Sequence, residues 1–193
     1  MDAFLLSFAV IFIAELGDKS QLMALAFATR YRATDVLIGI SLATLLVHLA
    51  SVVVGATVAA ALPTNLISLV AGLAFFAFAA WTWRGDTLGA DEAAKPDRAT
   101  GSTIVAVGTA FFLAELGDKT MLATITLATQ HPAIPVWIGS TVGMVAADAI
   151  AIAIGKVLGT RLPERWIRIG ATAAFIVFGV ILVLEGLGVL GQP

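Results

Sequence analysis

Two short acidic motifs, one hundred residues apart, carry the residues of this sequence best suited to chemistry. The first reads Ala-Glu-Leu-Gly-Asp-Lys-Ser over residues 14–20, and the second repeats it with Thr as the last residue over residues 114–120. Each motif lies in an apolar run and supplies two carboxylates, one ammonium group and one hydroxyl. Carboxylate and hydroxyl oxygens are the ligands that hard divalent cations prefer. The twin motifs therefore predict a cation site.

In continuous helices, the Glu and Asp of each motif would share a face, and the Lys would lie at the spacing of an ion pair with the Glu. The four carboxylates and two ammonium groups leave two negative charges, which one divalent cation or two protons would neutralise. Backbone carbonyls near the motif glycines would complete the shell. The expected metal ligands are Glu15, Asp18, Ser20, Glu115, Asp118 and Thr120, and Lys19 and Lys119 are the expected charge-balancing groups.

Four further side chains form two pairs with the same offset of one hundred residues. Asp148 and His48 lie near the middle of apolar runs and are candidates for a proton path, although an interhelical hydrogen bond explains His48 equally well. Gln21 and Met121 directly follow the motif hydroxyls. A thioether near the cation would favour Mn²⁺ over Ca²⁺, but Met121 also suits ordinary packing. Glu185, near the end of the last apolar run, is expected to be an interfacial acid.

Composition places these groups in a membrane. Of the 193 residues, 60% are hydrophobic and 12% are charged, whereas roughly a quarter are charged in soluble domains. The length suffices for about six spans of roughly 20 residues, without a sizeable soluble domain. The absence of cysteine excludes disulfides and thiolate metal sites, and a net charge of -2 argues against a nucleic-acid partner. Function must therefore lie among the helices.

Six apolar runs are long enough to cross a bilayer as helices. The first begins with an acid and continues through the motif, so we expect it to be retained as a span and not cleaved as a signal peptide. A polar stretch over residues 84–101 divides the chain in half. The runs cover residues 4–29, 34–62, 65–83, 102–129, 133–158 and 166–188.

The two halves match without a gap, which indicates an internal duplication. Because each copy holds three spans, the second must enter the membrane from the opposite side. We therefore expect an all-α integral membrane protein with six transmembrane helices in two inverted-topology three-helix repeats. The expected units are residues 1–85, a cytoplasmic linker over 86–100 and an inverted repeat over 101–193.

The distribution of basic residues predicts the orientation. Nine of the 11 Lys and Arg residues lie in or beside the first, third and fifth loops, and the other two belong to the motifs. By the positive-inside rule, these loops are cytoplasmic and both termini are non-cytoplasmic. Both motifs then lie near the bilayer midplane, where antiparallel helices direct four carboxylates at one volume.

Such a site favours exchange over one-way transport. A lone charge at the midplane costs at least about 2.5–3.5 kcal/mol, so the empty, deprotonated site is the costly state. Only the states loaded with a divalent cation or with protons would reorient readily, and the sequence therefore predicts an exchanger.

The doubled Glu-x-Gly-Asp-[Lys/Arg]-[Ser/Thr] signature resembles the Gdt-type family of membrane cation/proton exchangers, which has Golgi, chloroplast and bacterial members. The resemblance covers essentially the whole chain, and both motifs are intact. It implies transport of Mn²⁺, or in several members Ca²⁺, against protons, with the motif acids as ligands and without a resident cofactor. It also implies a multi-pass manganese exporter of a bacterial inner membrane, with the metal ion and the lipid bilayer as partners. The oligomeric state stays open.

Three other classes would also place acids in a membrane. An intramembrane enzyme such as a lipid phosphatase would need a deep Arg or a nucleophile–base pair, and no Arg lies deep in a span. A passive channel would have to pass cations along a pore lined by two lysines. An amino-acid exporter would need a site that matches an ammonium and a carboxylate together. We therefore expect a transporter and not an enzyme.

Overall fold

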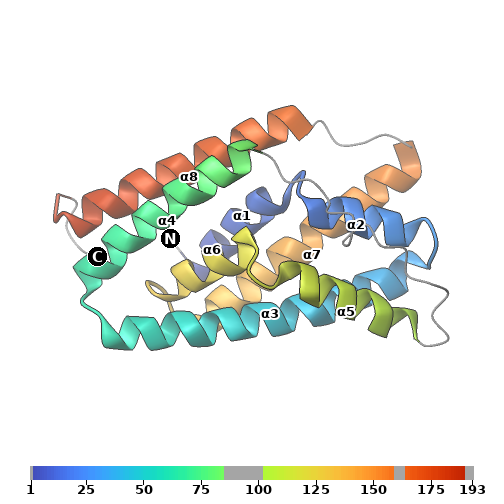
Figure 1. Cartoon of the computed structure of the whole chain (residues 1–193), viewed down its shortest axis with the longest axis horizontal. Coiled ribbons are helices and arrows are strands. Elements are labelled where there is room, and N and C mark those ends of the chain that lie inside the picture. The colour runs from blue at the N-terminus through green and yellow to red at the C-terminus, as the bar shows by residue number, and fades with distance from the viewer. Residues whose placement is uncertain (1, 85–101, 159–163, 190–193) are drawn as a thin grey trace.

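The computed structural model describes residues 2–84, 102–158 and 164–189. These ranges contain eight α-helices and no strands, with several helices running along the long axis of the molecule (Figure 1). The helices are α1 (Ala3–Glu15), α2 (Lys19–Ala28), α3 (Ala33–Ala61), α4 (Thr64–Arg84), α5 (Thr103–Glu115), α6 (Lys119–Ala128), α7 (Ala133–Leu158) and α8 (Glu164–Gly186).

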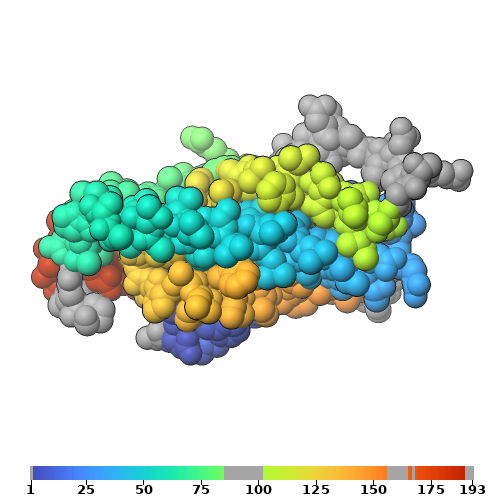
Figure 2. Space-filling view, turned by 90° about the horizontal axis from the view of Figure 1, so that it is seen from below, coloured from blue at the N-terminus to red at the C-terminus, as the bar shows by residue number. Residues whose placement is uncertain are grey.

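The duplication is visible in the helix boundaries, because each of α5 to α8 begins one hundred residues after its counterpart among α1 to α4. The two copies are interleaved. The most extensive helix–helix interfaces join α4 to α8, α1 to α7 and α3 to α5, so each pairs one helix from each copy. Figure 2 shows this on one face, where α3 lies between α5 and α7. The repeats are therefore units of sequence that fold into one interlocked bundle.

Four of the described helices are long and apolar enough to cross a membrane. They are α3, α4, α7 and α8, and their apolar segments cover 19 to 29 residues. The other four form two pairs, α1 with α2 and α5 with α6, and each pair is interrupted at a motif. The expectation of all-helical membrane architecture is confirmed, and a count of six spans requires each interrupted pair to make one crossing.

Both motif helices are broken, which corrects the expectation of continuous helices over residues 4–29 and 102–129. The backbone turns at Gly17, with a φ of 75°, and at Gly117, with a φ of 81°. This left-handed region is unfavourable for residues with a Cβ but open to glycine. Each break lies within the polar motif of its apolar run, and the motif glycine is the residue that allows the turn.

Equivalent glycines allow helices of the two copies to approach closely. A Cβ at Gly39 of α3 would lie 2.9 Å from the carbonyl oxygen of Ile104 in α5. A Cβ at Gly139 of α7 would clash with the carbonyl oxygen of Phe4 in α1. Small residues at such crossings are typical of helix packing in membranes.

The pseudo-two-fold axis can be located from equivalent residues that touch each other. The rings of Phe75 in α4 and Phe175 in α8 have centroids 5.8 Å apart. The hydroxyl of Thr44 in α3 lies 3.5 Å from the sulfur of Met144 in α7. Both contacts join equivalent positions of the two copies, so the axis passes between α4 and α8 and between α3 and α7.

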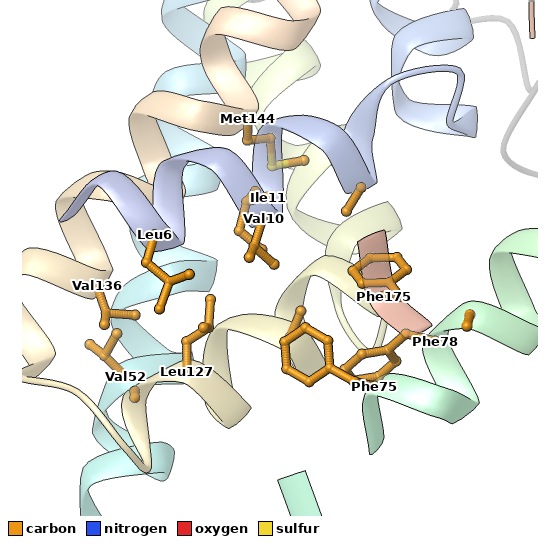
Figure 3. Close-up of a cluster of buried hydrophobic side chains, with 14 residues drawn as sticks. Leu6, Val10, Ile11, Val52, Phe75, Phe78, Leu127, Val136, Met144 and Phe175 are labelled. Carbon is orange, nitrogen blue, oxygen red and sulfur yellow. The ribbon is translucent and has the colours of Figure 1, made fainter. Parts of the chain in front are cut away.

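The interior beside α4 and α8 is filled by an apolar cluster, which we call the phenylalanine cluster (Figure 3). It joins α1, α3, α4, α6, α7 and α8, and its side chains are almost fully buried. Its larger members are Leu6, Val10, Ile11, Val52, Phe75, Phe78, Leu127, Val136, Met144 and Phe175.

Candidate metal site

The helix breaks determine where the motif carboxylates lie. Glu15 is the last residue of α1, and Asp18 is the N-cap of α2, with extended backbone geometry. Glu115 and Asp118 have the same places at the end of α5 and the start of α6. Each Glu and Asp therefore flank a turn, and the expectation that they share a face of one helix is wrong.

All four carboxylates are buried. Their exposed fractions are 0% for Glu15, 2% for Asp18, 1% for Glu115 and 3% for Asp118. Ionised groups are costly in a low-dielectric interior unless charges or hydrogen bonds compensate them. The structure therefore has to supply a partner for each acid or leave it available to a ligand.

The motif hydroxyls interact with the glutamates of their own copies. Ser20 is hydrogen-bonded to Oε1 of Glu15, and the Thr120 hydroxyl donates to Oε2 of Glu115 at 3.0 Å. Among the described residues, the second oxygen of each glutamate has no hydrogen-bond partner. Each glutamate thus has one oxygen held by a hydroxyl and one oxygen available to a proton or a cation.

The motif lysines form ion pairs with the aspartates of the opposite copies. Nζ of Lys119 lies 2.5 Å from Oδ1 of Asp18, and Nζ of Lys19 lies 3.4 Å from Oδ1 of Asp118. The i,i+4 pairing with glutamate assumed an unbroken helix, and the breaks remove that geometry. Instead, the two crossed ion pairs connect the start of α2 with the start of α6.

The described residues contain no group of three or more Asp, Glu or His side chains placed to hold a metal ion. Each aspartate instead pairs with a lysine, and each glutamate is hydrogen-bonded to the hydroxyl of its own motif. The arrangement brings the expected ligands of the two copies into one buried region without forming a closed carboxylate cage.

Gln21 and Met121 direct their polar atoms at the motif glycines. The Gly17 N–H donates to Oε1 of Gln21 at 2.8 Å, and the Gly117 N–H donates to the sulfur of Met121 at 3.2 Å. Nε2 of Gln21 also donates to the carbonyl oxygen of Ala147 in α7 at 3.0 Å. Both side chains therefore stabilise the breaks, and a role in ion selectivity stays a prediction.

Asp148 lies beside the motif acids and is fully buried, with an exposed fraction of 0%. Neither of its carboxylate oxygens has a hydrogen-bond partner among the described residues. Its neighbour Ala147 accepts the hydrogen bond from Gln21, which places this part of α7 beside the first motif. His48 is also buried, and its Nδ1 lies 3.4 Å from the hydroxyl of Thr141. That contact fits the hydrogen-bonded interpretation of His48.

Sequence reasoning missed Thr44 and Met144, which meet on the pseudo-two-fold axis and are almost fully buried. Their one signal in the sequence is that they lie one hundred residues apart, at equivalent positions of the two copies. The offset also identifies Gln21 and Met121 as equivalent, but it cannot show that they cap the glycine turns.

An interleaved bundle of two repeats, with buried acids where two helices break, is typical of secondary transporters. The comparison with known families agrees. A family model described as "Divalent cation/proton antiporter GDT1" matches residues 3–90 and 103–189, and the chain belongs to this family.

Relatives from bacteria and plastids align with almost the whole chain. A Vibrio cholerae protein named "Putative manganese exporter" is 33% identical over 183 residues, which cover 93% of this chain and 90% of the relative. The GDT1-like protein sll0615 of Synechocystis is 28% identical, with coverage of 94% and 96%. The chloroplastic GDT1-like protein 2 of rice is 30% identical, and the match covers 92% of this chain and 59% of the rice protein. No solved structure is significantly similar to the chain.

Proposed function

We propose that the chain exports Mn²⁺ from the cytoplasm in exchange for protons, through a site built from the two motifs. The observation that carries this proposal is the pair of equivalent glutamates. Glu15 and Glu115 are buried, and each has one oxygen without a hydrogen-bond partner among the described residues. Either a proton or a divalent cation can satisfy such an oxygen, which is the requirement for an exchange site.

The crossed ion pairs suggest that the aspartates and the glutamates have different roles in the site. Lys119 compensates Asp18, and Lys19 compensates Asp118, so these four groups contribute little net charge. The two remaining negative charges are those of the glutamates. Two protons on the glutamates, or one divalent cation between the copies, would make the region neutral and allow it to reorient in the bilayer.

Cation binding would require the lysines to move away from the aspartates. The ligand set would then comprise Glu15, Asp18, Glu115 and Asp118, with the Ser20 and Thr120 hydroxyls next to them. Carboxylate, hydroxyl and carbonyl oxygens suit Mn²⁺ and Ca²⁺, and the name of the Vibrio relative supports Mn²⁺ as the exported ion.

We further propose a bacterial inner-membrane location with the termini outside the cytoplasm. Support comes from the nine Lys and Arg residues outside the motifs, all in or beside alternate loops. The cytoplasmic linker over 86–100 lies outside the described residues. The units over 1–85 and 101–193 are proposed as the two repeats, each of which contributes one motif to the site.

The test is uptake of radioactive Mn²⁺ into everted membrane vesicles, with and without a pH gradient. Wild-type protein should accumulate Mn²⁺ only when the vesicle interior is acidic. Glu15→Gln and Glu115→Gln should each abolish uptake, because each removes a ligand and a proton acceptor. Asp35→Asn, which changes a partly exposed acid in the first turn of α3, is the matched control and should transport normally.

Three results would contradict the proposal. Uptake without a pH gradient at the coupled rate would indicate a passive channel. Near-normal exchange by either glutamate variant would mean that the motifs do not form one shared site. Accumulation of an amino acid but not of Mn²⁺ would favour an amino-acid exporter.

A further inference from the structure

A cavity of about 460 Å³ opens between α4, α6 and α8, near the loop that joins α6 to α7. Much of its wall is apolar, but one part is polar. Gln130 and His131 from the loop and Glu185 from α8 all line it. We call these three residues the mouth cluster.

The mouth cluster has the donor chemistry of a site for a divalent transition metal ion. Glu185 provides a partly exposed carboxylate. Burial lowers the pKa of the His131 imidazole, and the Glu185 carboxylate opposes this effect, so the ring is uncharged at neutral pH and offers a lone pair. Gln130 also lines the cavity, and its Nε2 is buried without a hydrogen-bond partner among the described residues.

Helix α6 connects this cavity directly with the motif region. Its first turn carries Lys119 and Thr120, and its last turns contribute Thr126 and Leu127 to the cavity wall. At a rise of about 1.5 Å per residue, Thr126 lies roughly 9 Å along the helix from Thr120. Leu6, Phe75 and Leu127, which are labelled in Figure 3, belong both to the phenylalanine cluster and to the cavity wall, so the cavity adjoins that cluster.

The mouth cluster is absent from the other copy. Gln130, His131 and Glu185 correspond, at the offset of one hundred, to Arg30, Tyr31 and Gly85. Figure 1 shows the loop between α2 and α3 at the opposite end of the molecule from the loop between α6 and α7. The amide, the imidazole and the carboxylate at one end thus have an arginine, a tyrosine and a glycine as counterparts in the other copy.

We propose that the mouth cluster is a second binding site for a divalent transition metal ion, a relay between the motif site and the water at this end of the bundle. The relay rests on the proposed metal transport, but Mn²⁺ binding to the mouth cluster can be measured separately from transport. The carboxylate would attract the hydrated cation, and the imidazole would favour Mn²⁺ over Ca²⁺, because nitrogen ligands suit transition metals better than Ca²⁺.

The test is a Mn²⁺ titration of the full chain in lipid nanodiscs, with free Mn²⁺ measured by electron paramagnetic resonance. The wild type should show two classes of site. The double variant Glu15→Gln/Glu115→Gln should keep the mouth site, whereas Glu185→Gln and His131→Gln should remove it and keep the motif site. Changes outside the direct ligands already weaken metal binding about 10- to 100-fold, so loss of the Glu185 ligand should weaken the mouth site by at least about tenfold. Ca²⁺ should compete poorly there.

Asp35→Asn is the control, because Asp35 is also a partly exposed acid but lies in the first turn of α3, next to the α2–α3 loop and not in the mouth cluster. Equal Mn²⁺ binding by Glu185→Gln and this control would overturn the relay, as would a complete loss of binding in the double glutamate variant. If the double variant instead transported Mn²⁺ normally, the proposed motif site would fail, while the titration of Glu185→Gln would still decide on the mouth site.

Discussion

The crossed ion pairs predict that two equivalent lysines differ in their contribution to stability. Lys119→Met removes the ammonium that lies 2.5 Å from Asp18, in a pair whose side chains are 4% and 1% exposed. Loss of one partner from a buried ion pair costs about 3–5 kcal/mol. Lys19 lies 3.4 Å from Asp118 and its side chain is 17% exposed. We expect Lys19→Met to lower the free energy of unfolding by about 1–2 kcal/mol, which lies between the contributions of exposed and of buried ion pairs.

The measurement is thermal unfolding in detergent, followed by tryptophan fluorescence. At about 2–4 °C per kcal/mol for a chain of this size, the Tm of Lys119→Met should fall at least about 2 °C further than that of Lys19→Met. Adding Asp18→Asn should restore much of the stability of Lys119→Met, because it removes the uncompensated charge. Equal effects of the two lysine variants, or no rescue by Asp18→Asn, would refute the assignment of the crossed pairs.

Two further predictions concern the turn and the orientation. Gly117→Ala should lower the free energy of unfolding by about 1–2 kcal/mol, because Gly117 has a φ of 81° and an added Cβ meets no atom, so that only backbone strain acts. The control is Gly170→Ala in α8, where an added Cβ also meets no atom and the protein should not be destabilised. Equal destabilisation by the two variants would contradict the role of backbone strain at Gly117. Of two cysteines introduced at Thr87 and Gln192, only the one at position 192 should be labelled by an impermeant thiol reagent in intact cells. Labelling at position 87 would contradict the proposed topology.

The apolar helices and the duplication were predictable because they depend on signals that accumulate over many residues. Hydropathy identified the long helices, and the offset of one hundred residues showed the duplication. The breaks at Gly17 and Gly117 were not predicted, because one glycine in a long apolar run is also compatible with close helix packing. Only the turn geometry distinguishes the two cases.

The pairing inside the site was less predictable, because it depends on contacts between the copies. The i,i+4 rule places a lysine beside the glutamate of its own motif, and it fails once the helix ends at Glu15. The actual partner of Lys119 is Asp18, about one hundred residues away in the sequence. Such a partner can be inferred only after the interleaved packing of α1, α2 and α6 is known.

The division of charge in the site leads to a last prediction, which concerns the membrane potential. If two protons on Glu15 and Glu115 replace one Mn²⁺, each reorientation moves a neutral complex, and transport should depend on the pH gradient alone. Each net charge that crosses the field would instead contribute about 2.3 kcal/mol per 100 mV. Asp148 is the group able to change this result, because it is fully buried beside the site and its oxygens have no hydrogen-bond partner among the described residues.

The experiment is Mn²⁺ uptake into proteoliposomes at a fixed pH gradient, with the potential set by K⁺ and valinomycin. A rate that is independent of potential supports exchange of two protons and leaves Asp148 a role in positioning, through its neighbour Ala147 and the hydrogen bond from Gln21. A steep dependence contradicts two-proton exchange. If Asp148→Asn then removed the dependence while His48→Gln did not, the third proton would be located on the carboxylate of α7, and the two repeats would differ in the number of protons that they carry.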